Sequence, residues 1–177
     1  VSHLGFIFAE HSPRFTESTF ESAGKERVGV FVNAPESFVH HCIRKHRLTI
    51  VQFHGDESPD YCHSFRNAVT VIKAIGVDDQ KNLTITENYI SAVDLLLFDT
   101  KSTQRGGTGK SFDWNLLENY TAKIPFLLSG GIGPDSIPDL QQFSHPQWIG
   151  IDLNSRFEQS PGIKNPVLFQ TFIEQLE

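Results

Sequence analysis

Short apolar runs alternate with segments that carry helix-start signals along the whole chain, and this alternation restricts the fold more than any other feature. The runs are rich in Val, Ile, Leu and Phe and are too short for typical helices, which is typical of strands buried on both faces. Seven strands are predicted: Leu4–Phe8, Arg27–Val32, Thr49–Phe53, Val69–Ile75, Asp94–Phe98, Pro125–Leu128 and Trp148–Leu153.

Helices are predicted between the strands, where a capping residue or a proline opens a segment. Thr16–Lys25 and Asp78–Ile90 carry no clear signal. The alternation predicts a parallel sheet with right-handed crossovers, either an open doubly wound sheet or a closed (β/α)8 barrel, and a count of seven strands separates the two only weakly. The predicted helices are Pro35–Lys45, a segment from Ser58-Pro59, Trp114–Tyr120 capped by Asp113, a segment from Gly133-Pro134-Asp135, and one from Asn165-Pro166 to Leu176.

Composition narrows the class of protein. The 177 residues, 38% of them hydrophobic, predict one globular domain over residues 1–177. The formal net charge is −6 without a Lys/Arg stripe, which argues against nucleic acid or an anionic membrane as partner and favours a small ligand. No apolar run of 18 residues and no signal-like start occur, so we expect a cytoplasmic location.

The cysteines and histidines predict neither a disulfide nor a metal site. Cys42 and Cys62 fall in helical segments without secretory context and are expected to be free thiols. His40 and His41 are adjacent and therefore point apart on a helix, and no His pair has the spacing of metal ligands. We therefore expect no metal.

Two glycine-rich segments follow predicted strands. Gly106, Gly107 and Gly109 precede a Lys-Ser pair, but Gln104 stands where a P-loop needs its first Gly, so this segment is expected to be a lid over a ligand or a flexible surface loop. Gly130 and Gly131 lead from a strand into a helix start. Bare backbone N–H groups and a helix N-terminus favour a phosphate site there, although the glycines could also serve only a tight turn. Asp152, near the end of the next predicted strand, and Ser155, just beyond that strand, would lie beside this loop.

Three further side chains stand at or just beyond strand ends. Asp99 follows four apolar residues and is placed to act as a general acid, or else to cap its loop or pair with Lys101. His54 could contact a polar substrate or be a structural residue. Arg14 could hold a carboxylate with its planar guanidinium or be solvated on its loop.

Taken in order, these motifs resemble phosphoribosylanthranilate isomerase of tryptophan biosynthesis, and they span nearly the whole chain. Their joint order is far more specific than any one of them. The matching segments are Leu4–Phe8, Ser12–Arg14, Val28–Asn33, Val51–Glu57, Leu97–Thr100, Gly106–Trp114, Ser129–Gly131, Asp152–Ser155 and Pro161-Gly162.

The resemblance implies a (β/α)8 barrel that performs an Amadori rearrangement of N-(5-phosphoribosyl)anthranilate without a cofactor. An acid protonates the ribose ring oxygen and opens the ring to a Schiff base, a base removes the proton from C2, and the enolamine collapses to the ketone. By resemblance Asp99 is the acid and Arg14 holds the anthranilate carboxylate. The phosphate would bind backbone amides of Gly130, Gly131 and Ser155, His54 and Asp152 would line the pocket, and the protein would be a monomer or homodimer.

The chain departs from the family in two places. The family's base is a Cys in a Lys-[Val/Ile]-Cys-Gly segment upstream of the first strand seen here, and the sequence contains no such segment and no Met. We therefore expect the first βα unit of the barrel to be absent and the chain as given to be nearly inactive. Arg156 stands where the family often has Gly, which leaves the local phosphate geometry open.

Two other functions compete with this one. A sister phosphate-binding barrel enzyme, such as indole-glycerol-phosphate synthase, needs a catalytic Lys, and Lys73 is the candidate that the sequence offers. A non-catalytic barrel that binds a phosphorylated ligand would keep the phosphate loops without needing the acid function of Asp99.

Overall fold

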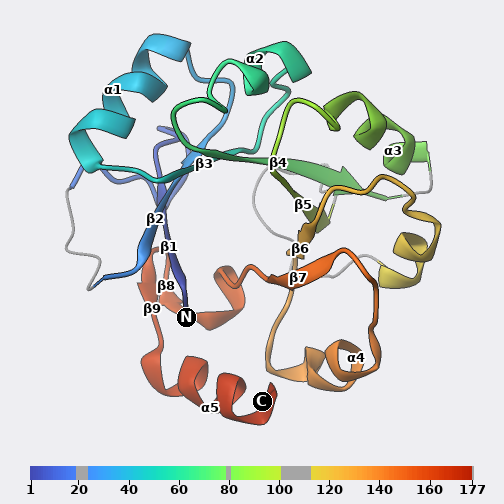
Figure 1. Ribbon diagram of the computed structural model, residues 1–177. Coiled ribbons are helices and arrows are strands. Elements are labelled where there is room, and N and C mark those ends of the chain that lie inside the picture. Colours follow the sequence, from blue (N-terminus) through green and yellow to red (C-terminus); the bar gives the residue numbers. More distant parts are fainter. Residues whose placement is uncertain (19–23, 79–80, 101–112, 177) are drawn as a thin grey trace. The chain divides into compact units, whose positions relative to one another are not determined.

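The computed structural model describes residues 1–18, 24–78, 81–100 and 113–176 (Figure 1). These residues form two compact units, of which unit 1 comprises Val1–Ala74 and Asn88–Leu96 and unit 2 comprises Ile75–Glu87 and Leu97–Glu177. All seven predicted strands are present, hydrogen-bonded in the order β1-β2-β3-β4-β5-β6-β7. The assignment of one domain to residues 1–177 stays a prediction.

Unit 1 is built on parallel strands. The pairs β1 with β2, β2 with β3 and β3 with β4 are all parallel, so the carboxyl ends of these strands lie at one edge of the sheet. That edge carries the loops after β1 and β3 (Figure 1). The elements are β1 (His3–Ile7), β2 (Glu26–Phe31), α1 (Glu36–His46), β3 (Ile50–Phe53), α2 (Pro59–His63) and most of β4 (Thr70–Val77).

The core of unit 1 is aromatic. All four residues of β3 are buried, and the Phe53 ring packs 5.2 Å from the Phe65 ring, centroid to centroid. Helix α1 buries Val39, Cys42 and His46, whose spacing places them on one face. The predicted start of the second helix is confirmed, because the Ser58 side chain accepts a hydrogen bond from the Tyr61 backbone N–H over 3.2 Å.

In unit 2 the sheet continues through β5, β6 and β7. The Ser129 N–H donates to the Phe98 carbonyl over 2.8 Å and joins β6 to β5, and the Asp152 N–H donates to the Leu128 carbonyl over 2.7 Å and joins β7 to β6. The remaining elements are α3 (Lys81–Thr84), η1 (Ile85–Tyr89), β5 (Leu95–Thr100), η2 (Trp114–Asn119), β6 (Phe126–Leu128), η3 (Pro134–Ser136), α4 (Ile137–Gln142), β7 (Trp148–Ile151), η4 (Ser155–Phe157), β8 (Glu158–Ser160), β9 (Ile163–Lys164) and α5 (Pro166–Leu176).

Three elements of unit 2 differ from the sequence prediction. The segment after Asp113 is a 3₁₀ helix rather than an α-helix, although Asp113 caps it as predicted by accepting from the Asn115 N–H. The segment after Gly133 divides into the short η3 and α4. A β8–β9 hairpin, turning at Gly162 with φ of 83°, forms from a polar stretch that lacks the apolar pattern of a strand.

Candidate active site

Asp99 lies at the carboxyl end of β5, directly after the fully buried Phe98. Its side chain is half-buried, and its Oδ1 atom accepts a hydrogen bond from the Thr100 backbone N–H over 2.7 Å. This contact fixes one carboxylate oxygen against the strand end. The predicted position of Asp99 at a strand terminus beside an apolar wall is therefore correct.

Gly130 lies against this carboxylate. A Cβ placed on Gly130 would overlap Asp99 Oδ1, the Thr100 backbone nitrogen and Thr100 Oγ1. Gly130 and Gly131 also have φ of 78° and 71°, in the left-handed region that favours glycine. The loop after β6 thus needs glycine at position 130 for two reasons, its backbone conformation and the space taken by the acid.

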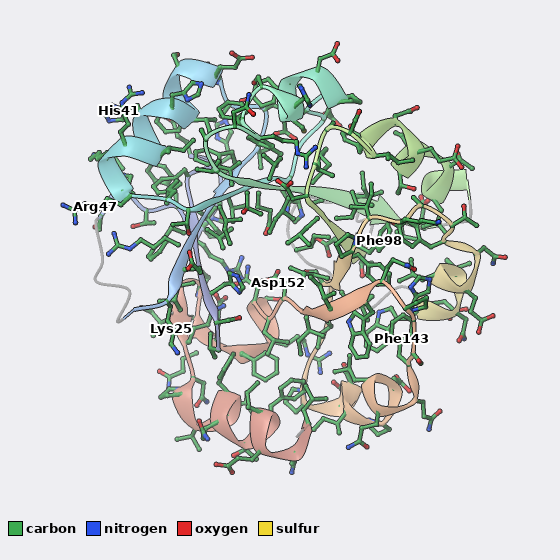
Figure 2. All side chains as sticks on the ribbon, viewed as in Figure 1. Lys25, His41, Arg47, Phe98, Phe143 and Asp152 are labelled. Carbon is green, nitrogen blue, oxygen red and sulfur yellow. The ribbon has the colours of Figure 1, made fainter. Side chains whose placement is uncertain are left out.

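The carboxyl end of β7 is tied to the same loop. The Ser129 hydroxyl donates to Asp152 Oδ2 over 3.0 Å, so Asp152 bridges the ends of β6 and β7. Figure 2 labels Asp152 just beyond β7. Ser155 follows as the exposed first residue of η4. Within unit 2 the structure therefore brings Asp99, Gly130, Gly131 and Asp152 to neighbouring strand ends, with Ser155 on the loop after β7.

The helical segment after the Gly130-Gly131 turn consists of two short pieces. The three-residue η3 precedes the six-residue α4, and the Gly133 N–H is already bonded to the Ser136 hydroxyl over 3.0 Å. A helix macrodipole needs several aligned turns, so backbone N–H groups of the loop matter more here than the dipole.

Arg14 and His54 belong to unit 1. Arg14 lies in the turn after β1, where its backbone N–H donates to the Ser12 hydroxyl, and its side chain is half-buried. His54 follows β3, and its Nδ1 atom is 3.1 Å from the Gln52 side-chain nitrogen. Both residues lie beyond carboxyl ends of the parallel strands of unit 1, as the sequence predicted.

A buried ion pair behind the His54 loop escaped the sequence analysis. Lys73 and Glu57 have side chains 3% and 2% exposed, and Lys73 Nζ is 3.3 Å from Glu57 Oε2. The same ammonium donates to the carbonyls of Phe53, Gly55 and Ala74, and the carboxylate accepts from the N–H groups of Asn33 and Gly55. Lys73 is thus fully engaged in holding the loop, which removes the candidate lysine of the indole-glycerol-phosphate synthase alternative.

The two thiols are free and buried. Burial raises the pKa of the Cys42 thiol, and burial, as the largest cause, raises the pKa of Cys62 to about 12. A thiol in this state is protonated at neutral pH and is a poor base. Neither cysteine therefore replaces the family's catalytic Cys.

Three further outcomes concern the described part of the chain. The predicted lid residues Gly106, Gly107 and Gly109 lie outside it, so the lid stays a prediction. Within the described ranges no three His, Cys, Asp or Glu side chains come together as metal ligands. No helix of those ranges has both the length and the apolar character needed to cross a bilayer.

Comparison with solved structures defines the class of protein. The chain matches the crystal structure of phosphoribosyl anthranilate isomerase from Thermotoga maritima with a TM-score of 0.83 and 28% identity, covering 99% of this chain and 88% of that one. It also matches such an isomerase in complex with reduced 1-(o-carboxyphenylamino)-1-deoxyribulose 5-phosphate, with a TM-score of 0.81, 26% identity and coverage of 99% and 87%. Together with the seven parallel strands, these matches identify an enzyme of the (β/α)8 barrel type.

Sequence comparison identifies the family. The profile of the family described as N-(5'phosphoribosyl)anthranilate (PRA) isomerase matches residues 1–175. The N-(5'-phosphoribosyl)anthranilate isomerase of Parabacteroides distasonis is 39% identical over 185 residues, covering 99% of this chain and 84% of that protein. The chain therefore belongs to the family of N-(5'-phosphoribosyl)anthranilate isomerases, which act in tryptophan biosynthesis.

Proposed function

We propose that Asp99 is the general acid of this isomerase and that Gly130, Gly131 and Ser155 bind the substrate phosphate. The observation that carries the proposal is the contact of the Asp99 carboxylate with the bare face of Gly130. A phosphate held by the Gly130-Gly131 turn would bring the attached ribose next to the acid. That is the arrangement a ring-opening step requires, because proton transfer needs donor and acceptor within hydrogen-bond reach.

The first step follows from this placement. Protonated Asp99 gives its proton to the ribose ring oxygen, the bond between that oxygen and C1 breaks, and the nitrogen lone pair forms the Schiff base. Removal of the C2 proton then gives the enolamine, which tautomerises to the ketone of the 1-(2-carboxyphenylamino)-1-deoxyribulose 5-phosphate. The base that takes the C2 proton is neither Cys42 nor Cys62, whose raised pKa values keep both thiols protonated.

Three further residues are assigned to substrate binding. Arg14 holds the anthranilate carboxylate through its guanidinium, which matches a carboxylate in two parallel hydrogen bonds. His54 in unit 1 and Asp152 in unit 2 are each assigned to substrate binding, and Asp152 accepts a hydrogen bond from Ser129. A cytoplasmic location and a monomeric or dimeric state stay predictions of the sequence.

Asp99→Asn tests the acid assignment, with Asp113→Asn as the matched control because Asn caps a helix as well as Asp. Turnover is followed by the loss of N-(5'-phosphoribosyl)anthranilate fluorescence, and ligand binding by titration with reduced 1-(o-carboxyphenylamino)-1-deoxyribulose 5-phosphate. We expect Asp99→Asn to lose a factor of about 100 to 10,000 in turnover while binding the reduced compound normally. Unchanged turnover in Asp99→Asn would reject the assignment.

A further inference from the structure

The guanidinium of Arg156 lies flat on Gly133, between the loops that follow β6 and β7. A Cβ on Gly133 would lie 2.6 Å from Arg156 Nε and 2.7 Å from its Cζ. The guanidinium can occupy this position, which we call its seat, only because residue 133 has no side chain. Gly133 has φ of −144°, an extended conformation open to any residue. The need for glycine at position 133 is therefore steric, and the nearest atoms that an added Cβ would meet all belong to Arg156.

Two contacts connect the seated guanidinium to the loop after β6. Arg156 Nη2 donates to Asp135 Oδ1 over 2.7 Å, and Nη1 points to the Gly131 carbonyl at 3.5 Å. The hydrogen bond from Arg156 is the main cause that lowers the pKa of Asp135. Arg156 stands next to Ser155 in sequence, while Asp135 and Gly131 belong to the other loop. One side chain thus joins the two loops assigned to the phosphate.

This arrangement contributes little to the stability of the fold. The Arg156 side chain is 33% exposed and that of Asp135 is 70% exposed, and exposed ion pairs have small effects on unfolding. The Asp135 carboxylate also reduces the positive potential that Arg156 would offer an anion. The arrangement is nevertheless specific, because it combines a glycine seat, a charged hydrogen bond and a carbonyl contact.

We propose that Arg156 and Asp135 form a clamp, an ion pair that fixes the loops after β6 and β7 relative to each other. The backbone amides of Gly131 and Ser155 can then bind the same phosphate group. Arg156 is then a positioning residue that determines affinity for the phosphate end of the substrate. This inference rests on the phosphate assignment made above. It differs from a direct phosphate contact, for which charge alone would be sufficient and Asp135 would be harmful.

The test measures binding of reduced 1-(o-carboxyphenylamino)-1-deoxyribulose 5-phosphate and of the same compound without its phosphate. We expect Arg156→Ala and Asp135→Ala each to weaken binding of the phosphorylated compound about fivefold, and the double variant to weaken it no further. Arg156→Lys should behave like Arg156→Ala, because an ammonium cannot lie flat on Gly133 and reach Asp135 as a planar fork. Binding of the compound without phosphate should not change in any variant.

Arg66→Ala is the matched control. Arg66 is also 33% exposed and pairs with Asp94 at 2.5 Å, but both residues belong to unit 1, whereas the loops after β6 and β7 belong to unit 2. Tighter binding of the phosphorylated compound by Asp135→Ala, or wild-type binding by Arg156→Lys, would overturn the clamp in favour of a simple charge effect. Equal weakening for both compounds would also overturn it. If the wild-type chain binds both compounds equally, the phosphate assignment itself is wrong, an outcome that no Arg156 variant can imitate.

Discussion

The carboxylate of Asp99 occupies the face of Gly130 on which any other residue would carry its Cβ. The residue assigned to the acid and the residue assigned to the phosphate loop therefore share one space. A change at position 130 must displace Asp99 or Thr100, whose backbone nitrogen lies at the same face. Binding of the phosphate at Gly130 and orientation of the Asp99 carboxylate are thus linked, because these two residues are in direct contact.

Gly130→Ala is accordingly expected to reduce turnover at least about 100-fold, the cost of a misplacement near 1 Å at a reacting group. Gly162→Ala is the control, because Gly162 has the same left-handed conformation, with φ of 83°, but no atom within 4 Å of an added Cβ. Both variants carry the backbone strain, and Gly130→Ala alone carries the overlap. Similar turnover in the two variants would contradict the link between loop and acid.

Thr100→Val should stabilise the protein. The Thr100 hydroxyl is buried and has no hydrogen-bond partner among the described residues, and a buried hydroxyl in that state costs about 1 to 3 kcal/mol. Val has nearly the same shape and removes that cost, so the midpoint of urea unfolding should rise. Thr100→Ser keeps the hydroxyl and should show no such gain. A lower midpoint for Thr100→Val would mean that the hydroxyl has a partner in the folded protein.

Lys73→Met should be among the most destabilising single changes in unit 1. It leaves the Glu57 carboxylate, 2% exposed, without its cation, and breaking a buried pair in this way costs about 3 to 5 kcal/mol. Adding Glu57→Leu removes the stranded charge, so the double variant should recover part of the loss in urea unfolding. Lys164→Met is the comparison, since Lys164 pairs with Glu158 but is 43% exposed. Equal losses in Lys73→Met and Lys164→Met would show that burial of the pair adds nothing.

The sequence predicted the strands and the glycine turn because their signals are local. Runs such as Leu95–Phe98 identify a buried strand by composition, and the polar residue at its end is then placed by the parallel topology. The ion pair of Lys73 and Glu57 had no such signal. Lys73 stands in an apolar run, and only the fold brings its ammonium to the carboxylate and carbonyls around Gly55.

Two further features have no signal in the local sequence pattern. The β8–β9 hairpin forms from a mostly polar stretch without apolar alternation, so periodicity carries no information about it. The seat of Arg156 on Gly133 depends on residues 23 positions apart in two different loops. Sequence reasoning found the position of Arg156 unusual but could not show that Asp135 would hold its guanidinium.

His46 makes the stability of unit 1 sensitive to acid. Burial, as the largest cause, and the nearby positive charge of Lys45 lower the pKa of His46 below its ordinary value of 6.5, and its ring packs 4.8 Å from that of Phe8. In the unfolded chain His46 therefore takes up a proton near pH 6.5, whereas in the folded chain its ring is still neutral at that pH. Proton uptake by His46 therefore favours unfolding. The contribution of the neutral His46 ring to the free energy of unfolding is complete above about pH 6.5. It is lost as the pH falls below that value, by at most about 1.4 kcal/mol per pH unit.

The free energy of urea unfolding, measured from pH 7.5 to pH 5.5, tests this sign. His46→Gln removes the titrating group, so its unfolding free energy should fall less over this range than that of the wild type. His11→Gln is the control, because His11 is exposed in the turn after β1 and is not among the groups that lower the pKa of His46. Its pH dependence should follow that of the wild type. If the His46→Gln curve keeps the full wild-type slope, the acid sensitivity arises from another group, because a neutral amide has no proton to take up in this range.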